Sequence, residues 1–334
     1  MNNNPFEYSS DNKRYLTQNY YLQKRFGKKV IKLSLNCGFS CPNRDGLKGS
    51  GGCTYCSSDL SGDYAGNPAH SVLRQLEEQK ELMSSKWHDG YYIPYFQAGS
   101  NTYAPVGTLR KLFYTALEFE NTVGLAVATR ADCINDECLD LLSELSEKTY
   151  LVVELGLQTI HDVTANHINR CHSYAEFLET YRRLTDRNIN VCIHIINGLP
   201  WETPEMMMQT ASEISRLKPH SLKIHMLHII KDTDMYREYL EKPFHVLTLE
   251  EYVEIVCNQL EILPPETIIQ RVTGDGKKET LFMPEWTLKK FVVMNEIDKE
   301  MKRRNSWQGK KYKESPDTYE TPYSCILRIN RSRF

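Results

Sequence analysis

Strand-like and helix-like segments alternate along most of this chain, and this alternation limits the folds that it can adopt. Residues 71–86 and 108–119 carry apolar side chains at helical spacing. Short apolar runs indicate strands at 30–37, 92–97, 123–129, 150–156, 189–196 and 221–228. Repeated strand–helix units are typical of an α/β fold with a mainly parallel sheet.

The six strand–helix units favour an incomplete, TIM-like (βα)6 barrel over a closed barrel of eight units. A doubly wound open sheet is the alternative. Both architectures gather ligand-binding groups at the carboxyl ends of the strands. We divide the chain into an N-terminal segment (1–29), the barrel core (30–262) and a C-terminal extension with a basic tail (263–334). In the extension we expect a short strand, a glycine-rich turn and one helix over 284–304.

Three helix starts carry capping signals. Ser173 with Glu176, and Thr248 with Glu251, have the spacing of a capping box, in which side chain and backbone cap each other. Thr203 stands before a proline, as expected of an N-cap followed by proline in the first helical position. We therefore expect helices to begin at these three places.

Four cysteines lie within twenty residues, directly after the first predicted strand. Cys37, Cys41, Cys53 and Cys56 form the spacing C-x3-C-x11-C-x2-C, with several glycines between them. A Cys-x-x-Cys pair lets two thiolates reach one centre, and glycine permits tight turns around it. Four thiolates could form a closed structural zinc site, whereas three could hold a [4Fe–4S] cluster with one open iron. The position at the mouth of a barrel favours a reactive centre.

Composition places few further limits on function. The 334 residues are 40% hydrophobic with a formal net charge of −2, which describes a chain large enough for a substantial core. The N-terminus lacks a signal-peptide pattern and no apolar run reaches membrane-spanning length, so we expect a cytoplasmic protein without membrane contact. The remaining cysteines are interpreted as buried thiols in regular structure: Cys133, Cys138, Cys171, Cys192, Cys257 and Cys325.

Two segments are strongly basic despite the near-neutral total. Residues 12–36 contain no acidic side chain and alternate lysine and arginine with tyrosine and phenylalanine, and residues 299–313 mix basic side chains with Trp307 and Tyr312. Basic groups neutralise phosphates and aromatic rings stack on unpaired bases, so this mixture fits a folded RNA. The alternative is an ordinary solvated charged surface.

Several motifs together resemble one family: Ser34–Gly46, Gly51–Cys56, Phe96–Thr102, Glu154–Thr159 and Gly198–Thr203. The chain resembles a radical S-adenosylmethionine (radical SAM) enzyme of the bacterial YhcC/YtqA type, which is related to the catalytic subunit of Elongator. The wide cysteine spacing is similar to that of the Elongator-like branch. The resemblance implies that Cys41, Cys53 and Cys56 are cluster ligands, and that Cys37 is an extra thiol and a candidate catalytic group.

The same resemblance implies two cofactors, a [4Fe–4S] cluster and S-adenosylmethionine, and an electron donor such as flavodoxin or ferredoxin. One electron from the cluster would cleave S-adenosylmethionine to methionine and a 5′-deoxyadenosyl radical. The residues implied to contact S-adenosylmethionine are Tyr55, Ser100, Gln158, Arg170, His194, Gly198, Leu199 and Pro200. In the alternative interpretation, Gln158 and Arg170 form a strand-end hydrogen-bonding pair, and Tyr55 and His194 are packed core residues.

The Elongator relationship and the basic segments point to tRNA as the partner. No acetyltransferase domain is expected after the core, so the resemblance implies remodelling of an existing side chain on wobble uridine, from 5-carboxymethylaminomethyluridine to 5-aminomethyluridine. Arg271, Lys310 and Lys311 are candidate substrate contacts, and His225 and His228 could face the substrate. The alternatives are a radical enzyme acting on a metabolite or a protein, and a structural zinc module that binds RNA. The oligomeric state stays open.

Overall fold

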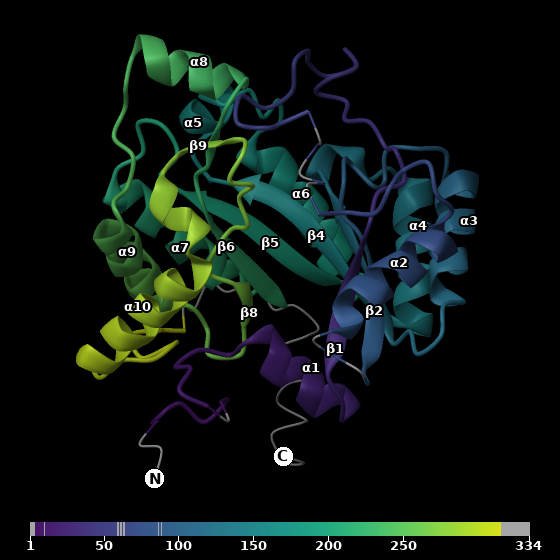
Figure 1. Cartoon of the computed structure of the whole chain (residues 1–334), viewed down its shortest axis with the longest axis horizontal. Coiled ribbons are helices and arrows are strands. Elements are labelled where there is room, and N and C mark those ends of the chain that lie inside the picture. Colours follow the sequence, from purple (N-terminus) through teal and green to yellow (C-terminus); the bar gives the residue numbers. More distant parts are fainter. Residues whose placement is uncertain are drawn as a thin grey trace.

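One curled sheet of parallel strands forms the centre of the molecule (Figure 1). The computed structural model describes residues 4–9, 11–58, 60, 62, 64–85, 87 and 89–314. The strand order β1-β2-β3-β4-β5-β6-β8 follows the chain, so the sheet is a half-barrel whose edge strands are β1 and β8. The strands are β1 (Val30–Leu35), β2 (Tyr91–Phe96), β3 (Gly124–Thr129), β4 (Tyr150–Gln158), β5 (Asn190–Asn197), β6 (Ser221–Met226) and β8 (Ile268–Arg271).

Helices follow the strands and cover the outer face of the half-barrel (Figure 1). Leu33, Leu125 and Val153 alternate along their strands with inward-facing residues and pack against these helices in the largest hydrophobic cluster. The helices are α1 (Gln18–Phe26), α2 (Val72–Ser84), α3 (Val106–Leu117), α4 (Asp136–Lys148), α5 (Asp162–His167), α6 (Tyr174–Thr185), α7 (Pro204–Leu217), α8 (Asp234–Glu241), α9 (Leu249–Ile262) and α10 (Lys290–Arg303).

The predicted helix starts are confirmed. Ser173 and Glu176 form a reciprocal capping box at α6, and Thr248 and Glu251 do the same at α9. The Thr203 side chain accepts a hydrogen bond from a backbone N–H in the first turn of α7, and proline stands at the first helical position. These caps satisfy N–H groups that have no partner inside the helix.

The sheet has seven strands, the six predicted for the core and the short strand expected in the C-terminal extension. The strand of the extension is β8, which pairs in parallel with β6, with Ser221 opposite Ile268. A short antiparallel pair, β7 (Ile229–Ile230) with β9 (Leu281–Met283), stands apart from this sheet. The helix expected over 284–304 is divided into a 3₁₀ turn (Glu285–Leu288) and α10, because Lys289 leaves helical geometry at ψ 56°. The proposed domain boundaries stay a prediction.

The N-terminal segment closes the end of the half-barrel away from the cysteines. Helix α1 lies at the lower end in Figure 1 and inserts Leu22 between inward-facing residues, among them Ile93 and Val152. Burial of one leucine side chain contributes roughly 1.5–3 kcal/mol. Tyr21 packs edge-on against His220, with ring centroids 5.7 Å apart. The aromatic residues of this segment therefore contribute to a hydrophobic plug.

His220 makes this plug sensitive to acid. Burial, with the nearby charge of Arg25, lowers the pKa of His220 from 6.5 to about 3. Between these values the unfolded chain binds the extra proton, so stability falls as pH falls below about 6.5. We expect His220→Gln to flatten the dependence of unfolding free energy on pH between about 6.5 and 4, by up to about 1.4 kcal/mol per pH unit.

Chemical unfolding of the apoprotein across this pH range checks the prediction. The exposed His245, which pairs with Glu251 at the surface, provides a matched control as His245→Gln. Equal pH slopes for His220→Gln and the wild type would show that His220 does not titrate as the burial argument requires.

Candidate active site

The cysteine loop follows β1 at the carboxyl end of the half-barrel. Gly51 and Gly52 adopt positive φ angles of 80° and 89°, a conformation that side chains with a Cβ rarely adopt. The N–H of Gly52 donates to the carbonyl of Asn43 at 2.8 Å, and the N–H of Cys56 donates to the carbonyl of Cys53 at 2.9 Å. These turns fold the four-cysteine segment back on itself as one loop.

Three of the four predicted cysteines act on one another electrostatically. Burial, together with the neighbouring Cys53 and Cys41, raises the pKa of the Cys56 thiol to about 11, although Arg44 opposes the shift. Burial also raises the pKa of Cys37 to about 12, but no other cysteine contributes there. Cys37 instead packs against the main hydrophobic cluster. The described structure thus groups Cys41, Cys53 and Cys56 and separates Cys37 from them.

Asn43 and Arg44, which lie within the loop, donate hydrogen bonds to the cysteine group and to the neighbouring backbone. Asn43 is completely buried, and its side-chain nitrogen lies 3.6 Å from the Cys53 sulfur, as a donor. Arg44 donates to the carbonyl oxygens of Cys56 at 3.0 Å and Ser58 at 3.3 Å. Donors beside sulfur atoms favour the thiolate form, which is the form that binds metal. Sequence analysis assigned no role to either residue.

A fifth thiol lies against the loop, contrary to the interpretation of Cys171 as a buried thiol in regular structure. Cys171 stands between α5 and α6 with φ 62°, and its sulfur donates to Asn169 Oδ1 at 3.2 Å. A Cβ on Gly49 would lie 2.8 Å from this sulfur. The interpretation failed because the two segments are more than one hundred residues apart in sequence.

The loop after β2 adds a buried acceptor beside the cysteines. The N–H of Ser100 donates to the carbonyl of Ser40, next to Cys41, at 3.1 Å. Asn101 is fully buried and donates to the carbonyl of Ala128 at 2.8 Å, while its Oδ1 has no partner. An unsatisfied buried acceptor is costly, and a donor such as the ammonium group of an amino acid would satisfy it. Such an acceptor would suit an amino group like that of S-adenosylmethionine, and the predicted contact of Ser100 with that group stays a prediction.

Arg130, directly after β3, is a site residue that sequence analysis overlooked. Its Nε and Nη2 donate to the two carboxylate oxygens of Asp132, each at 2.9 Å. Although burial opposes it, Asp132 and the nearby thiols of Cys41 and Cys53 raise the pKa of Arg130. A permanent cation beside these thiols stabilises their ionised form. Its position at a strand carboxyl end was the available signal.

Arg170 supports the end of β4. Its guanidinium is buried and donates to the backbone carbonyls of Leu157, Thr159 (2.7 Å) and His172 (3.0 Å). Leu157 and Thr159 flank Gln158, which holds an unusual φ of 61°. Among the described residues, the Arg170 side chain bonds to backbone carbonyls and Asp162, and makes no hydrogen bond to the Gln158 side chain. Arg170 therefore positions the backbone of Gln158, and a direct cofactor contact by either residue stays a prediction.

Tyr55 and the turn after β5 lie in one hydrophobic cluster. Tyr55 packs there with Leu199, and its hydroxyl hydrogen-bonds to Cys53. Gly198 holds a φ of 86°, and Pro200 is buried next to it. The structure thus places Tyr55 beside the Gly198–Pro200 turn, and the predicted contact of these residues with S-adenosylmethionine stays a prediction.

A buried ionic cluster that sequence analysis did not identify occupies the inside of the half-barrel. Glu154 of β4 is completely buried, and its carboxylate pairs with Lys32 of β1 and Lys223 of β6 at 2.5 Å each. His194 of β5 contacts the same carboxylate at 2.9 Å. Burial opposes ionisation of Glu154, but the two lysine charges hold its pKa well below the usual range. Burial lowers the pKa of Lys223 to about 8. The network joins four strands.

This cluster fits an ion-pair network better than a metal site. Glu154, Cys192 and His194 offer ligand atoms within 4.8 Å of one another. Two ammonium groups already neutralise the carboxylate, so an added cation would be repelled. Burial lowers the pKa of His194 to about 4, which keeps its ring neutral. His194 is therefore held by Glu154, and its predicted contact with S-adenosylmethionine stays a prediction.

The remaining predicted residues lie at different ends of the molecule. The His225 ring is 5.5 Å from that of His194 inside the half-barrel, and His228 packs against the loop after β8. Arg271 pairs with Asp275 in that loop at 2.7 Å. Lys311 pairs with Glu261, and Lys310 lies over Trp307. The segment of Lys310 and Lys311 follows α10 and lies away from the cysteine loop (Figure 1).

Known proteins distinguish between the metal hypotheses. The model of the Radical SAM superfamily matches residues 40–214, and the Radical_SAM C-terminal domain matches residues 219–303. This chain belongs to the radical SAM superfamily. The predicted resemblance is confirmed by YtqA of Bacillus subtilis, which is 49% identical over 93% of this chain and 96% of its own length. Membership implies a [4Fe–4S] cluster and S-adenosylmethionine, and the grouping of three cysteines fits that donor set.

Similarity to the Elongator-like branch is weaker. A tRNA uridine(34) acetyltransferase of Methanocaldococcus jannaschii is 26% identical over 46% of this radical SAM protein and 28% of its own length. The structure of Elp3 from Methanocaldococcus infernus superposes with a TM-score of 0.63 and 16% identity, covering 84% of this chain and 64% of that one. The structural likeness confirms the half-barrel fold. No helix among the described residues is long and apolar enough to cross a membrane.

Proposed function

We propose that this radical SAM protein modifies tRNA and converts 5-carboxymethylaminomethyluridine at the wobble position to 5-aminomethyluridine. The observation that carries the proposal is the sequence similarity to a tRNA uridine(34) acetyltransferase, which lies in about half of this chain. YtqA aligns over nearly its whole length, whereas less than a third of the acetyltransferase aligns. The shared part supports radical chemistry on uridine and gives no support for acetyl transfer.

The residues of this chain prepare a shielded site for such chemistry. Cys41, Cys53 and Cys56 would hold the cluster, with an electron donor such as flavodoxin or ferredoxin in the cytoplasm. When bound, the cluster supplies one electron and S-adenosylmethionine supplies the group that removes a hydrogen atom. The α1 plug packs Leu22 against inward-facing residues of the half-barrel, and Glu154 is completely buried inside it, which limits the access of water from that side. Hydrogen abstraction beside the side-chain nitrogen would begin the loss of the carboxymethyl unit.

The test is an anaerobic assay of the reconstituted protein with reductant and S-adenosylmethionine. Two substrates are compared, tRNA that carries 5-carboxymethylaminomethyluridine and the same tRNA without the carboxymethyl unit. We expect 5′-deoxyadenosine and 5-aminomethyluridine to form together, and only with the first tRNA. Formation of 5′-deoxyadenosine that is insensitive to both tRNAs would show that another class of substrate is used.

A further inference from the structure

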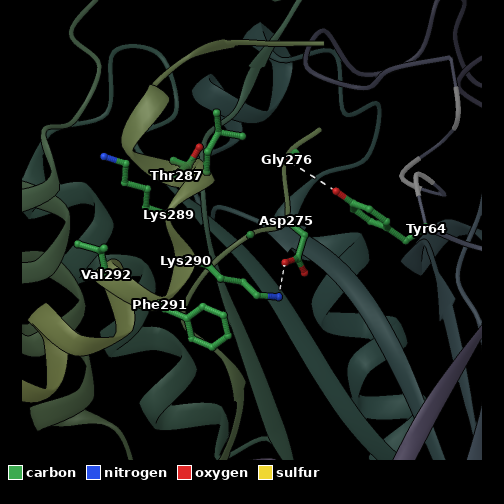
Figure 2. Close-up of a pocket in the computed structure, with 10 residues that line it drawn as sticks. Tyr64, Asp275, Gly276, Thr287, Lys289, Lys290, Phe291 and Val292 are labelled. Carbon is green, nitrogen blue, oxygen red and sulfur yellow. Dashed lines mark hydrogen bonds and ion pairs between the residues drawn. The ribbon is translucent and has the colours of Figure 1, made fainter. Parts of the chain in front are cut away.

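A cleft of about 450 Å³ lies where the half-barrel is open at its side (Figure 2). One wall is Tyr64, from the segment between the cysteine loop and α2, and the other is the start of α10. The Tyr64 hydroxyl donates to the carbonyl of Gly276 at 3.5 Å, in the loop after β8. Because β1 and β8 are the edge strands, this contact bridges the opening at the same rim as the cysteines.

The cleft presents aromatic side chains to solvent from both walls. Phe291 is 71% exposed and Tyr64 is 53% exposed, and the exposed Leu288 and Val292 extend the apolar surface. In Figure 2, the Tyr64 hydroxyl points toward Gly276, and Asp275 and Lys290 are drawn between Tyr64 and Phe291. Exposed aromatic rings of this kind provide stacking surfaces for unpaired bases, because every base has a flat face.

The described residues that line the cleft include one carboxylate, Asp275, and two ammonium groups, Lys289 and Lys290, so their net charge is positive. Asp275 pairs with Arg271 at 2.7 Å and with Lys290 at 2.8 Å, so two cations face one carboxylate. The Lys290 nitrogen is also 5.9 Å from the centre of the Phe291 ring. A cation adjacent to a stacking ring matches a nucleotide, whose phosphate is anionic and whose base is flat. A purely apolar protein segment would offer no counterpart to the excess positive charge.

The N-terminal segment, in which sequence analysis expected RNA contacts, places no exposed aromatic ring at this rim among the described residues. In the N-terminal basic segment, Tyr21 and Phe26 pack against the inner hydrophobic cluster that contains Leu22. Helix α1, which carries them, lies at the opposite end of the half-barrel (Figure 1). The rim cleft is on the cysteine side, where the reacting base must enter. Its rings are exposed and its net charge is positive.

We propose that the rim cleft binds an unpaired nucleotide of the RNA substrate next to the target uridine, by stacking on Phe291 and Tyr64. The proposal rests on the proposed function. It places the neighbouring base at the side opening while the target uridine enters the half-barrel. It also predicts that the cleft acts in substrate binding and has no role in forming 5′-deoxyadenosine.

The test uses the reconstituted full-length protein with bulk tRNA and a synthetic anticodon stem–loop as probes. We expect Phe291→Ala to weaken binding of both RNAs about tenfold and to raise KM by a similar factor with little change in kcat. Tyr64→Ala has the same effect, whereas Phe291→Trp retains binding because stacking is preserved. Leu82→Ala, which removes another exposed apolar side chain on α2, is the matched control and leaves RNA binding unchanged.

Three outcomes separate the two proposals. If the wild type modifies tRNA but Phe291→Ala and Tyr64→Ala bind it normally, the nucleotide site is wrong and the proposed function stands. If the wild type neither binds nor modifies tRNA, both proposals fail. If Phe291→Ala changes self-association or binding of a protein partner and leaves RNA affinity unchanged, the cleft is a protein interface and the inference is overturned.

Discussion

Cys53→Ala is expected to abolish cluster binding and to lower 5′-deoxyadenosine formation by at least about a thousandfold, since a [4Fe–4S] cluster with one open iron needs all three thiolates. The Cys53 thiol interacts electrostatically with Cys41 and Cys56, and its sulfur accepts a hydrogen bond from the Asn43 side chain. Removing this sulfur therefore removes the member that contacts both other thiols. Iron and sulfide content after anaerobic reconstitution, together with 5′-deoxyadenosine measured by mass spectrometry, checks this result.

Cys37→Ala is the matched control, because it removes a thiol from the same segment that packs against the hydrophobic cluster. We expect this variant to retain about four iron atoms per chain and the brown colour of the cluster. Equal loss of metal in Cys37→Ala and Cys53→Ala would favour a closed four-cysteine site. Retention of radical activity in Cys53→Ala would show that the ligand set is wrong.

Glu154→Gln is expected to destabilise the protein by about 3–5 kcal/mol at neutral pH, because it leaves two lysines without their buried counter-charge. Lys32 and Lys223 both pair with this carboxylate, and Gln removes its charge while keeping its shape. The deficit should shrink as pH rises, since the unpaired lysines lose their protons more readily in the fold than in the unfolded chain. Chemical unfolding of the apoprotein at several pH values measures both effects.

The double variant Glu154→Gln with Lys223→Met tests the physical cause. Removing Lys223 eliminates one of the unpaired charges, so we expect the double variant to be more stable than Glu154→Gln alone. A loss below about 1 kcal/mol in Glu154→Gln, or an additive loss in the double variant, would contradict an ionic network of this strength. Iron content should stay unchanged in both variants that reconstitute, because the network does not include the grouped cysteines.

Local signals in the sequence predict much of this fold. Six strands follow from apolar runs, and the helix starts at Ser173, Thr203 and Thr248 follow from side chains that cap their own helices. The seventh strand, Ile268–Arg271, is also visible as a short strand. Its place in the sheet is not, because that depends on hydrogen bonds to β6, and short-range patterns do not specify a distant partner.

The sequence by itself determined the superfamily, the four-cysteine segment and the end of the half-barrel that carries it. The resemblance of the sequence to known enzymes also picked Cys41, Cys53 and Cys56 as the ligand set, which stays a prediction. The tertiary structure adds their surroundings, because Cys37 packs against the hydrophobic cluster while Cys53 and Cys41 act on Cys56. The tertiary structure also decided the pairing of Lys32, Glu154 and Lys223, which come from three strands, and the meeting of Tyr64 with Gly276. Charged and aromatic side chains that are far apart in the chain come into contact only when the strands assemble into the curled sheet. Local sequence patterns therefore do not predict these contacts.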